Sequence, residues 1–173
     1  MTILDINLAR LHYLDDVLPA NVSTLYSTAD AIESLLPTAD VIIGTVLIPG
    51  AKAPKLVTRA MLAKMQKGSI LIDVAIDQGG CFESSKPTTH TEPTYDVDGI
   101  THYCVANMPG AYPRTSTMAL TNATLPYLLK LAQFGADEVL TAFPLMKGAL
   151  NTFDGKLTNK PVAEAHGLAY SEI

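Results

Sequence analysis

The hydrophobic pattern along the chain alternates between short continuous apolar runs, typical of buried strands, and apolar residues spaced three to four apart, typical of helices. The runs at 41–48 and 69–76 are rich in β-branched residues, which predicts strands covered on both faces. Pro126 is expected to kink or divide the longest helix. Strands are expected at 2–4, 22–26, 41–48, 69–76 and 100–106, helices at 8–18, 29–36, 58–66, 115–134, 136–142 and 161–166, and a hairpin at 153–156.

This alternation predicts right-handed βαβ units and an open, parallel α/β sheet. Ligands of such sheets bind at the carboxyl ends of the strands. That rule selects four places in the sequence, which are Asp5, the loop 46–52, Asp77 with the glycines that follow it, and the segment 107–110.

Composition excludes several classes of protein. The chain has 173 residues, of which 48% are hydrophobic and 17% charged, so it should fold rather than remain disordered. Its net charge of -5 gives no attraction to nucleic acid or anionic lipid. No stretch has the length of a membrane span, and no signal-peptide pattern occurs. Cys81 and Cys104 suggest neither a disulfide framework nor a zinc site, and no histidine pair has metal-ligand spacing, which favours the cytoplasm and no metal.

Asp5, at the end of the first predicted strand, stands where a dinucleotide-binding fold places the carboxylate that binds the adenosine ribose. Such an acid favours NAD over NADP because it repels a 2′-phosphate. An alternative role is to cap the helix that starts near Leu8. The glycine fingerprint should precede this acid by about 20 residues, and no G-x-G-x-x-G occurs in the chain. If Asp5 is the ribose acid, the first strand, the glycine loop and the first helix of the fold lie outside this sequence.

Asp77 is predicted at the tip of a buried strand, followed by two glycines that let the backbone approach a ligand. A carboxylate there can act as a general acid or base, although Asp before Gly-Gly is also a common turn residue. Among the histidines, His90 has the best chance of facing a site. His102 is expected in the core, and the cysteines are expected to be buried and unreactive.

Three longer runs cover the loop 46–52, Asp77 and the segment 107–110. They are VLIPGAKAPKLVTRAML (46–62), DVAIDQGGCFESSKPTTH (73–90) and HYCVANMPGAYPRTSTMALTNATLPY (102–127). In these runs the sequence resembles the C-terminal part of alanine dehydrogenase, an NAD-dependent oxidoreductase, and less closely the NAD-binding subunit of proton-translocating transhydrogenase. Asp77 favours the dehydrogenase, because the transhydrogenase subunit typically lacks this residue.

The resemblance implies a role for individual residues. Asp77 matches the catalytic acid, which assists the exchange of water and ammonia at the substrate carbon. Asp5 would bind the ribose. Lys86 stands where relatives often carry arginine, and lysine keeps the positive charge but lacks the planar guanidinium that forms two parallel hydrogen bonds. The full cofactor-binding set is Asp5, Arg10, Ser27, Val46, Leu47, Val74, Ala75, Ile76, Asp77, Lys86, Val105, Ala106, Asn107 and Met108.

By the same resemblance, residues 1–119 form a partial NAD-binding Rossmann domain, and residues 120–173 form helices that pack on a substrate domain absent from this chain. The catalytic histidine and the substrate-holding arginine and lysine lie in that absent region, so the chain alone is expected to be inactive. Exposed apolar helix faces predict an interface, and full-length relatives are generally hexamers. Two alternatives stay open, a fragment of a transhydrogenase-like subunit and a non-catalytic nucleotide-binding or interaction module.

Overall fold

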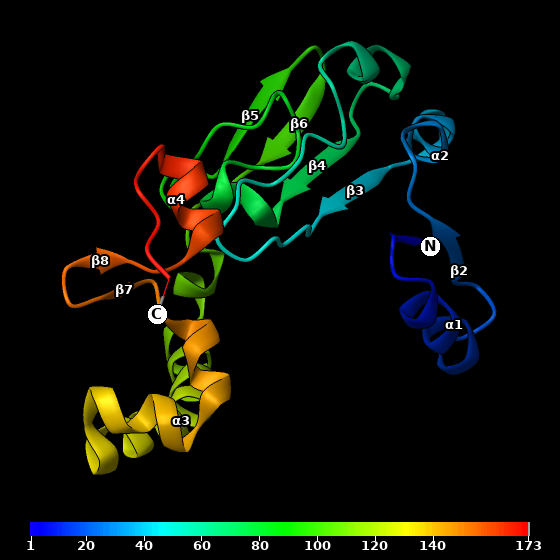
Figure 1. Ribbon diagram of the computed structural model, residues 1–173. Coiled ribbons are helices and arrows are strands. Elements are labelled where there is room, and N and C mark those ends of the chain that lie inside the picture. The colour runs from blue at the N-terminus through cyan, green and yellow to red at the C-terminus, as the bar shows by residue number, and fades with distance from the viewer. Residues whose placement is uncertain (173) are drawn as a thin grey trace. The chain divides into compact units, whose positions relative to one another are not determined.

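The computed structural model describes residues 1–172 and divides the chain into two compact units. The first unit consists of Met1–Val46 and Ala53–Ala106, and the second of Leu47–Lys52 and the chain from Asn107 on. Strands alternate with helices in the first unit and helices dominate the second (Figure 1), which confirms the predicted α/β class with C-terminal helices.

The elements follow the predicted order closely. The first unit contains β1 (Thr2–Asp5), α1 (Leu8–Val17), β2 (Ser23–Tyr26), α2 (Ala29–Leu35), β3 (Val41–Gly44), β4 (Ile70–Asp73), β5 (Thr94–Val97) and β6 (Ile100–Tyr103). The second unit contains α3 (Pro113–Ala142), β7 (Thr152–Phe153), β8 (Lys156–Leu157) and α4 (Lys160–His166).

The strands of the first unit form two sheets. β1 pairs with β2 in parallel. The other sheet has four strands in the order β3-β4-β6-β5, of which β3, β4 and β6 are parallel. The sequence pattern did not predict β5, which forms an antiparallel hairpin with β6. Its Thr-Tyr-Asp-Val alternation is brief and lies in a stretch rich in turn residues. The hairpin closes at Asp98 and Gly99, both with positive φ.

Each sheet has an open edge. Among residues 1–172, β1 pairs only with β2, and β3 pairs only with β4. Val41 and Ile43 of β3 are 47% and 58% exposed, so the prediction that this strand is covered on both faces is wrong. A parallel strand normally has neighbours and helices on both sides. The described residues supply no such cover on that face of β3.

Three predicted strands end earlier than their apolar runs. β3 stops at Gly44, β4 at Asp73 and β6 at Tyr103. After Asp73 the chain turns into a 3-10 helix, Val74–Gln78, because the Asp73 carboxylate accepts hydrogen bonds from backbone further along. The helix predicted at 58–66 is also shorter, a 3-10 helix over Ala60–Lys64. Apolar composition does not reveal where such tertiary contacts end an element.

The core of the first unit lies between the four-stranded sheet and the segments 53–65 and 75–82, which pack against it. Phe82 and Leu71 are its largest fully buried side chains together with Leu36. The buried cluster consists of Leu36, Ala53, Val57, Leu62, Met65, Leu71, Ala75, Cys81, Phe82 and Ile100.

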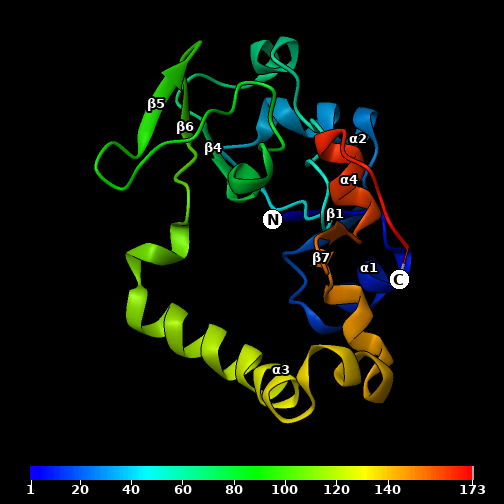
Figure 2. The ribbon, with the colours of Figure 1, turned by 60° about the vertical axis from the view of Figure 1, so that its left-hand side comes forward.

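In the second unit, α3 is divided at Gly135 (φ 74°, ψ 173°) and not at Pro126, which lies inside the helix. Figure 2 shows the yellow-to-orange part of α3 running in a new direction. The predicted hairpin and the last helix are both present, the latter ended by Gly167. Within the described residues no helix is long and apolar enough to cross a membrane. Large apolar side chains are exposed along α3: Met118, Leu120, Leu125, Tyr127, Leu128, Leu129 and Leu131.

Candidate functional site

Asp5 and Ser27 meet at the carboxyl ends of β1 and β2. The Ser27 amide donates a hydrogen bond to the Asp5 carbonyl oxygen at 2.9 Å. The half-buried Asp5 side chain accepts a hydrogen bond through Oδ1 from the Asn7 amide, also at 2.9 Å. The structure therefore brings together two residues of the predicted cofactor-binding set.

Asn7, and not Asp5, caps α1. Its side-chain oxygen accepts a hydrogen bond from the Arg10 amide at 3.0 Å. The alternative role of Asp5 as a helix cap is therefore not found. Arg10 lies in the first turn of α1 with its guanidinium 5.0 Å from the centre of the Tyr13 ring, a cation–π distance. The structure therefore places the charge of Arg10 over the Tyr13 ring.

Asp77 lies on the 3-10 helix Val74–Gln78 that follows β4, and not at the tip of the strand as predicted. Its side chain and that of Val74 are exposed. Ala75 and Ile76 are 7% and 4% exposed, so the exposed side chains of this turn are those of Val74 and Asp77. This 3-10 helix follows the carboxyl end of the parallel strand β4, so the position of Asp77 still agrees with the rule that selected it.

The carboxylate at the end of β4 is Asp73, which sequence reasoning missed. It is fully buried, and its Oδ2 accepts hydrogen bonds from the Cys81 amide at 2.9 Å and the Ser85 hydroxyl at 2.5 Å. A side chain at Gly80 would place its Cβ 2.7 Å from the same oxygen, so the backbone approaches a carboxylate of the protein here. The repeat of Asp-x-x-x-Asp before Gly-Gly was the available signal.

Both cysteines are fully buried and free. Burial, followed by the charge of the adjacent Asp73, raises the pKa of the Cys81 thiol to about 12. A thiol with this pKa is protonated and a poor nucleophile at neutral pH. The structure agrees with the prediction that the cysteines are packing residues.

Lys86 lies against Tyr95. Its amide donates a hydrogen bond to the Tyr95 hydroxyl at 2.8 Å, and its ammonium lies 4.4 Å from the centre of the tyrosine ring. Burial, together with a hydrogen bond to the Cys104 thiol, raises the pKa of Tyr95. A cavity of about 280 Å³ at this place is lined by Lys86, Pro87, Thr88, Thr89, Glu92, Thr94 and Tyr95.

The remaining predicted cofactor residues lie in both compact units. In the first unit, Val46 is partly buried against the core, and Val105 is fully buried. Ala106 donates its amide to the Thr88 carbonyl at 3.1 Å, which fixes the chain after β6. Leu47, Asn107 and Met108 belong to the second unit. Leu47 is 67% exposed, and Asn107 has left-handed backbone (φ 54°).

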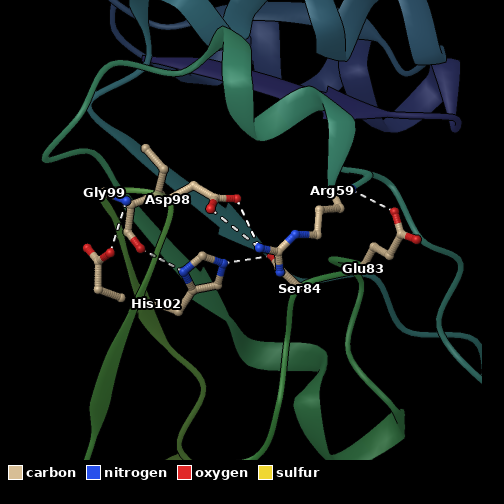
Figure 3. A network of polar contacts seen from close by, with 8 residues as sticks. Arg59, Glu83, Ser84, Asp98, Gly99 and His102 are labelled. Carbon is tan, nitrogen blue, oxygen red and sulfur yellow. Dashed lines mark hydrogen bonds and ion pairs between the residues drawn. The ribbon is translucent and has the colours of Figure 1, made fainter.

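His102 is a buried core histidine, as predicted. Its Nε2 lies 2.7 Å from the Ser84 hydroxyl and its Nδ1 2.9 Å from the Ile100 carbonyl oxygen, so both ring nitrogens have partners (Figure 3). Figure 3 also shows Arg59, which pairs with Asp98 at 3.1 Å and donates its amide to Glu83 at 2.6 Å.

The other histidines offer no metal site. His90 is exposed in the loop near Thr88, and His12 and His166 are exposed on helices. Within residues 1–172, no group of three or more His, Cys, Asp or Glu side chains is arranged to hold a metal ion.

Comparison with known proteins gives consistent results. Residues 1–160 match the family described as alanine dehydrogenase/PNT, C-terminal domain. The chain is 59% identical over 172 residues to an alanine dehydrogenase of Halomonas elongata, covering 99% of this chain and 46% of that protein. It is 52% identical over 174 residues to an alanine dehydrogenase of Staphylococcus haemolyticus, covering 100% of this chain and 47% of the relative.

Solved structures show the same likeness. An L-alanine dehydrogenase superimposes with a TM-score of 0.81 at 44% identity, covering 96% of this chain and 46% of that one. A transhydrogenase from Sinorhizobium meliloti has a TM-score of 0.68 at 23% identity, covering 92% and 42%, which shows a shared fold. The chain spans about half the length of the curated relatives it matches.

Proposed function

Because the chain belongs to the alanine dehydrogenase/PNT C-terminal domain family, we propose that it is the cofactor-binding half of an NAD-dependent L-alanine dehydrogenase. The complete enzyme would convert L-alanine, NAD and water to pyruvate, ammonia and NADH. The observation that carries this proposal is the position of Asp5, Ser27 and Asp77 at or just beyond the carboxyl ends of the parallel strands β1, β2 and β4. Open α/β sheets bind their ligands at that edge.

The residues present fit NAD at two of its parts. Asp5 offers a half-buried carboxylate beside Ser27, which suits the two hydroxyls of a ribose and disfavours a 2′-phosphate. The exposed turn that carries Val74 and Asp77 suits the nicotinamide end. The glycine loop that would hold the pyrophosphate is not among residues 1–173. The fit therefore covers the two ends of the cofactor and leaves its centre to another segment.

NAD, when bound, would accept the hydride from the substrate carbon. The chain itself would contribute the Asp77 carboxylate as the group that holds or moves a proton while water and ammonia exchange. The exposed apolar side chain of Val74 would exclude water beside this carboxylate. Lys86 would supply positive charge, already oriented by its contact with Tyr95.

The open edges of β1 and β3 support the further proposal that the sheet is a Rossmann sheet without its first strand. The Rossmann sheet has the strand order 3-2-1-4-5-6, so its first strand lies between strands 2 and 4. In this chain β1 would correspond to strand 2 and β3 to strand 4. The exposed apolar side chains of α3 would pack on the substrate domain, with the boundary near residue 119. The chain alone would be inactive, and the complete enzyme would be a cytoplasmic homo-oligomer acting on alanine and pyruvate.

The test combines this chain with the part of the Halomonas elongata alanine dehydrogenase that lies outside the match. We expect alanine-dependent NADH formation by the mixture and none by the chain alone. An Asp77→Asn substitution should lower the rate by about 10²- to 10⁴-fold, the usual contribution of a general acid or base, whereas Asp16→Asn, on the exposed end of α1, should leave it unchanged.

Calorimetric titration provides a second readout. NAD should bind more tightly than NADP, and Asp5→Asn should reduce that preference. Activity that does not depend on Asp77, or the absence of NAD binding by both the chain and the mixture, would contradict the proposal.

A further inference from the structure

We propose that Lys55 and Asp73 are positioning residues for the turn that carries Asp77, which consists of the 3-10 helix Val74–Gln78 with Gly79 and Gly80. The two residues hold this turn from opposite sides. The inference rests on the proposed function, because it assigns these two residues a task in the reaction for which Asp77 is the catalytic residue. Neither residue belongs to the cofactor-binding set that the sequence predicted. Both contact the segment 79–82, which closes the turn behind Asp77.

Lys55 completes a row of hydrogen bonds to consecutive carbonyl groups. The extended segment that contains it runs beside the turn, with the Ala53 amide donating to the Gln78 carbonyl at 3.1 Å and the Leu56 amide to the Cys81 carbonyl at 2.7 Å. Between these, the backbone of that segment reaches neither glycine carbonyl. The Lys55 ammonium donates to Gly79 at 2.6 Å and to Gly80 at 2.7 Å, with a longer contact to Phe82 at 3.3 Å.

Asp73 holds the amide side of the same segment. Its buried carboxylate accepts from the Cys81 amide at 2.9 Å and from the Phe82 amide at 3.4 Å, and the Ser85 hydroxyl fixes the same oxygen. Hydrogen bonds to an ionised group are stronger than those between neutral groups. Asp73 therefore ties the end of β4 directly to the far side of the turn.

One peptide group is held at both ends. The carbonyl of Gly80 accepts from the Lys55 ammonium, and the amide of the next residue, Cys81, donates to the Asp73 carboxylate. A cation at the oxygen and an anion at the N–H both stabilise the dipole of that peptide in one orientation. The preceding amide, that of Gly80, bonds back to the Ala75 carbonyl at 3.0 Å, so the turn is closed onto the helix that carries Asp77.

Glycine is needed at this point for two reasons. Gly79 and Gly80 both have left-handed backbone, with φ of 88° and 72°. At Gly80 a Cβ would also lie 2.7 Å from Asp73 Oδ2 and 3.0 Å from the Ser85 Cβ. The Gly-Gly pair therefore serves the contact with Asp73, and we infer that its task is to let this carboxylate position the turn.

The experiment substitutes the exposed member of the pair, so that folding is preserved. We expect Lys55→Met to accelerate amide hydrogen exchange at residues 79–82 about tenfold, as the loss of charge-assisted hydrogen bonds implies. Lys64→Met is the matched control, because this exposed lysine makes one ion pair, with Glu33 at 2.6 Å, away from the turn. Exchange elsewhere in the chain should not change in either variant.

Kinetics then separate positioning from stability. In the reconstituted mixture, Lys55→Met should lower kcat about tenfold while the KM for alanine stays within about twofold, the pattern of an interaction that acts in the transition state. Lys55→Arg, which keeps the charge and the donors, should recover most of kcat. Asp73→Asn serves as the second variant, with a larger expected effect on both exchange and kcat.

Each outcome of the exchange and kinetic measurements either supports or overturns the proposal. Exchange equal to wild type in Lys55→Met overturns the proposal, and so does faster exchange with an unchanged kcat. If the wild-type mixture forms no NADH, the proposed function fails, while the exchange measurement still decides whether the two residues hold the turn. Faster exchange with reduced kcat and recovery by arginine supports the proposal.

Discussion

Replacement of Gly44 by alanine should destabilise the first unit, although the substitution is small. Gly44 ends β3 with backbone that alanine can adopt, because its φ lies outside the left-handed region. An added Cβ would lie 2.7 Å from Phe82 Cζ and closer still to the Cys81 sulfur. Carbon atoms pack best at about 3.5–4.0 Å. Both neighbours are almost fully buried, at 1% and 0% exposure, so neither can move aside at little cost.

The expected cost follows from two opposing effects. Overpacking of a core typically costs about 1–3 kcal/mol, whereas exchanging glycine for alanine in a strand gains about 0.5–1 kcal/mol. The overlap here is close to 1 Å with Phe82 alone, so we expect a net loss of about 2 kcal/mol. For a chain of this size that corresponds to a fall in Tm of about 4–8 °C.

The assay is urea unfolding followed by far-ultraviolet circular dichroism, since the chain has no tryptophan. Gly148→Ala is the control, because nothing lies within 4 Å of its added Cβ. The double variant Gly44→Ala/Cys81→Ala removes the sulfur and should be more stable than the sum of its single changes predicts, by about 0.5–3 kcal/mol. Wild-type stability of Gly44→Ala, or strict additivity in this cycle, would refute the reasoning.

Two further predictions concern titration and backbone conformation. Burial and Asp73 raise the pKa of Cys81 from its ordinary value of 9.0 to about 12, so the unfolded chain releases this proton at lower pH than the folded chain does. The contribution of the protonated thiol is complete below pH 9 and is lost as pH rises toward 12, by up to about 1.4 kcal/mol per pH unit. Urea midpoints measured across this window should show the loss relative to Cys81→Ala, and a constant difference between the two proteins would contradict it. Gly167→Ala should cost about 1 kcal/mol, because the residue that ends α4 has φ 63° and open space around it. Thermal unfolding of this variant beside Gly148→Ala checks the prediction, which fails if the two variants have the same midpoint.

Local sequence determined the features that depend on neighbouring residues. Apart from β5, the order of strands and helices follows from periodicity. The turn at Asp154 and Gly155 and the end of α4 at Gly167 follow from residues that tolerate positive φ. The same patterns placed Asp5 at the end of β1 and Asp77 on the carboxyl side of β4, although β4 ends at Asp73 and Asp77 lies on the 3-10 helix that follows. The residue runs around Asp77 indicated the family. These features require no knowledge of what lies across the sheet.

Only the tertiary structure decided where the strands end and which carboxylate is buried. Asp73 and Asp77 are four residues apart and have similar neighbours in the sequence. Asp73 is nevertheless fully buried, whereas Asp77 is exposed. The difference comes from partners further along the chain. Cys81 and Ser85 donate hydrogen bonds to the Asp73 carboxylate, and Lys55, which is 24 or more residues away in sequence, donates to the turn that carries Asp77. A strand ends where such contacts outweigh its ladder hydrogen bonds, and their free energy depends on positions in space that local periodicity does not encode.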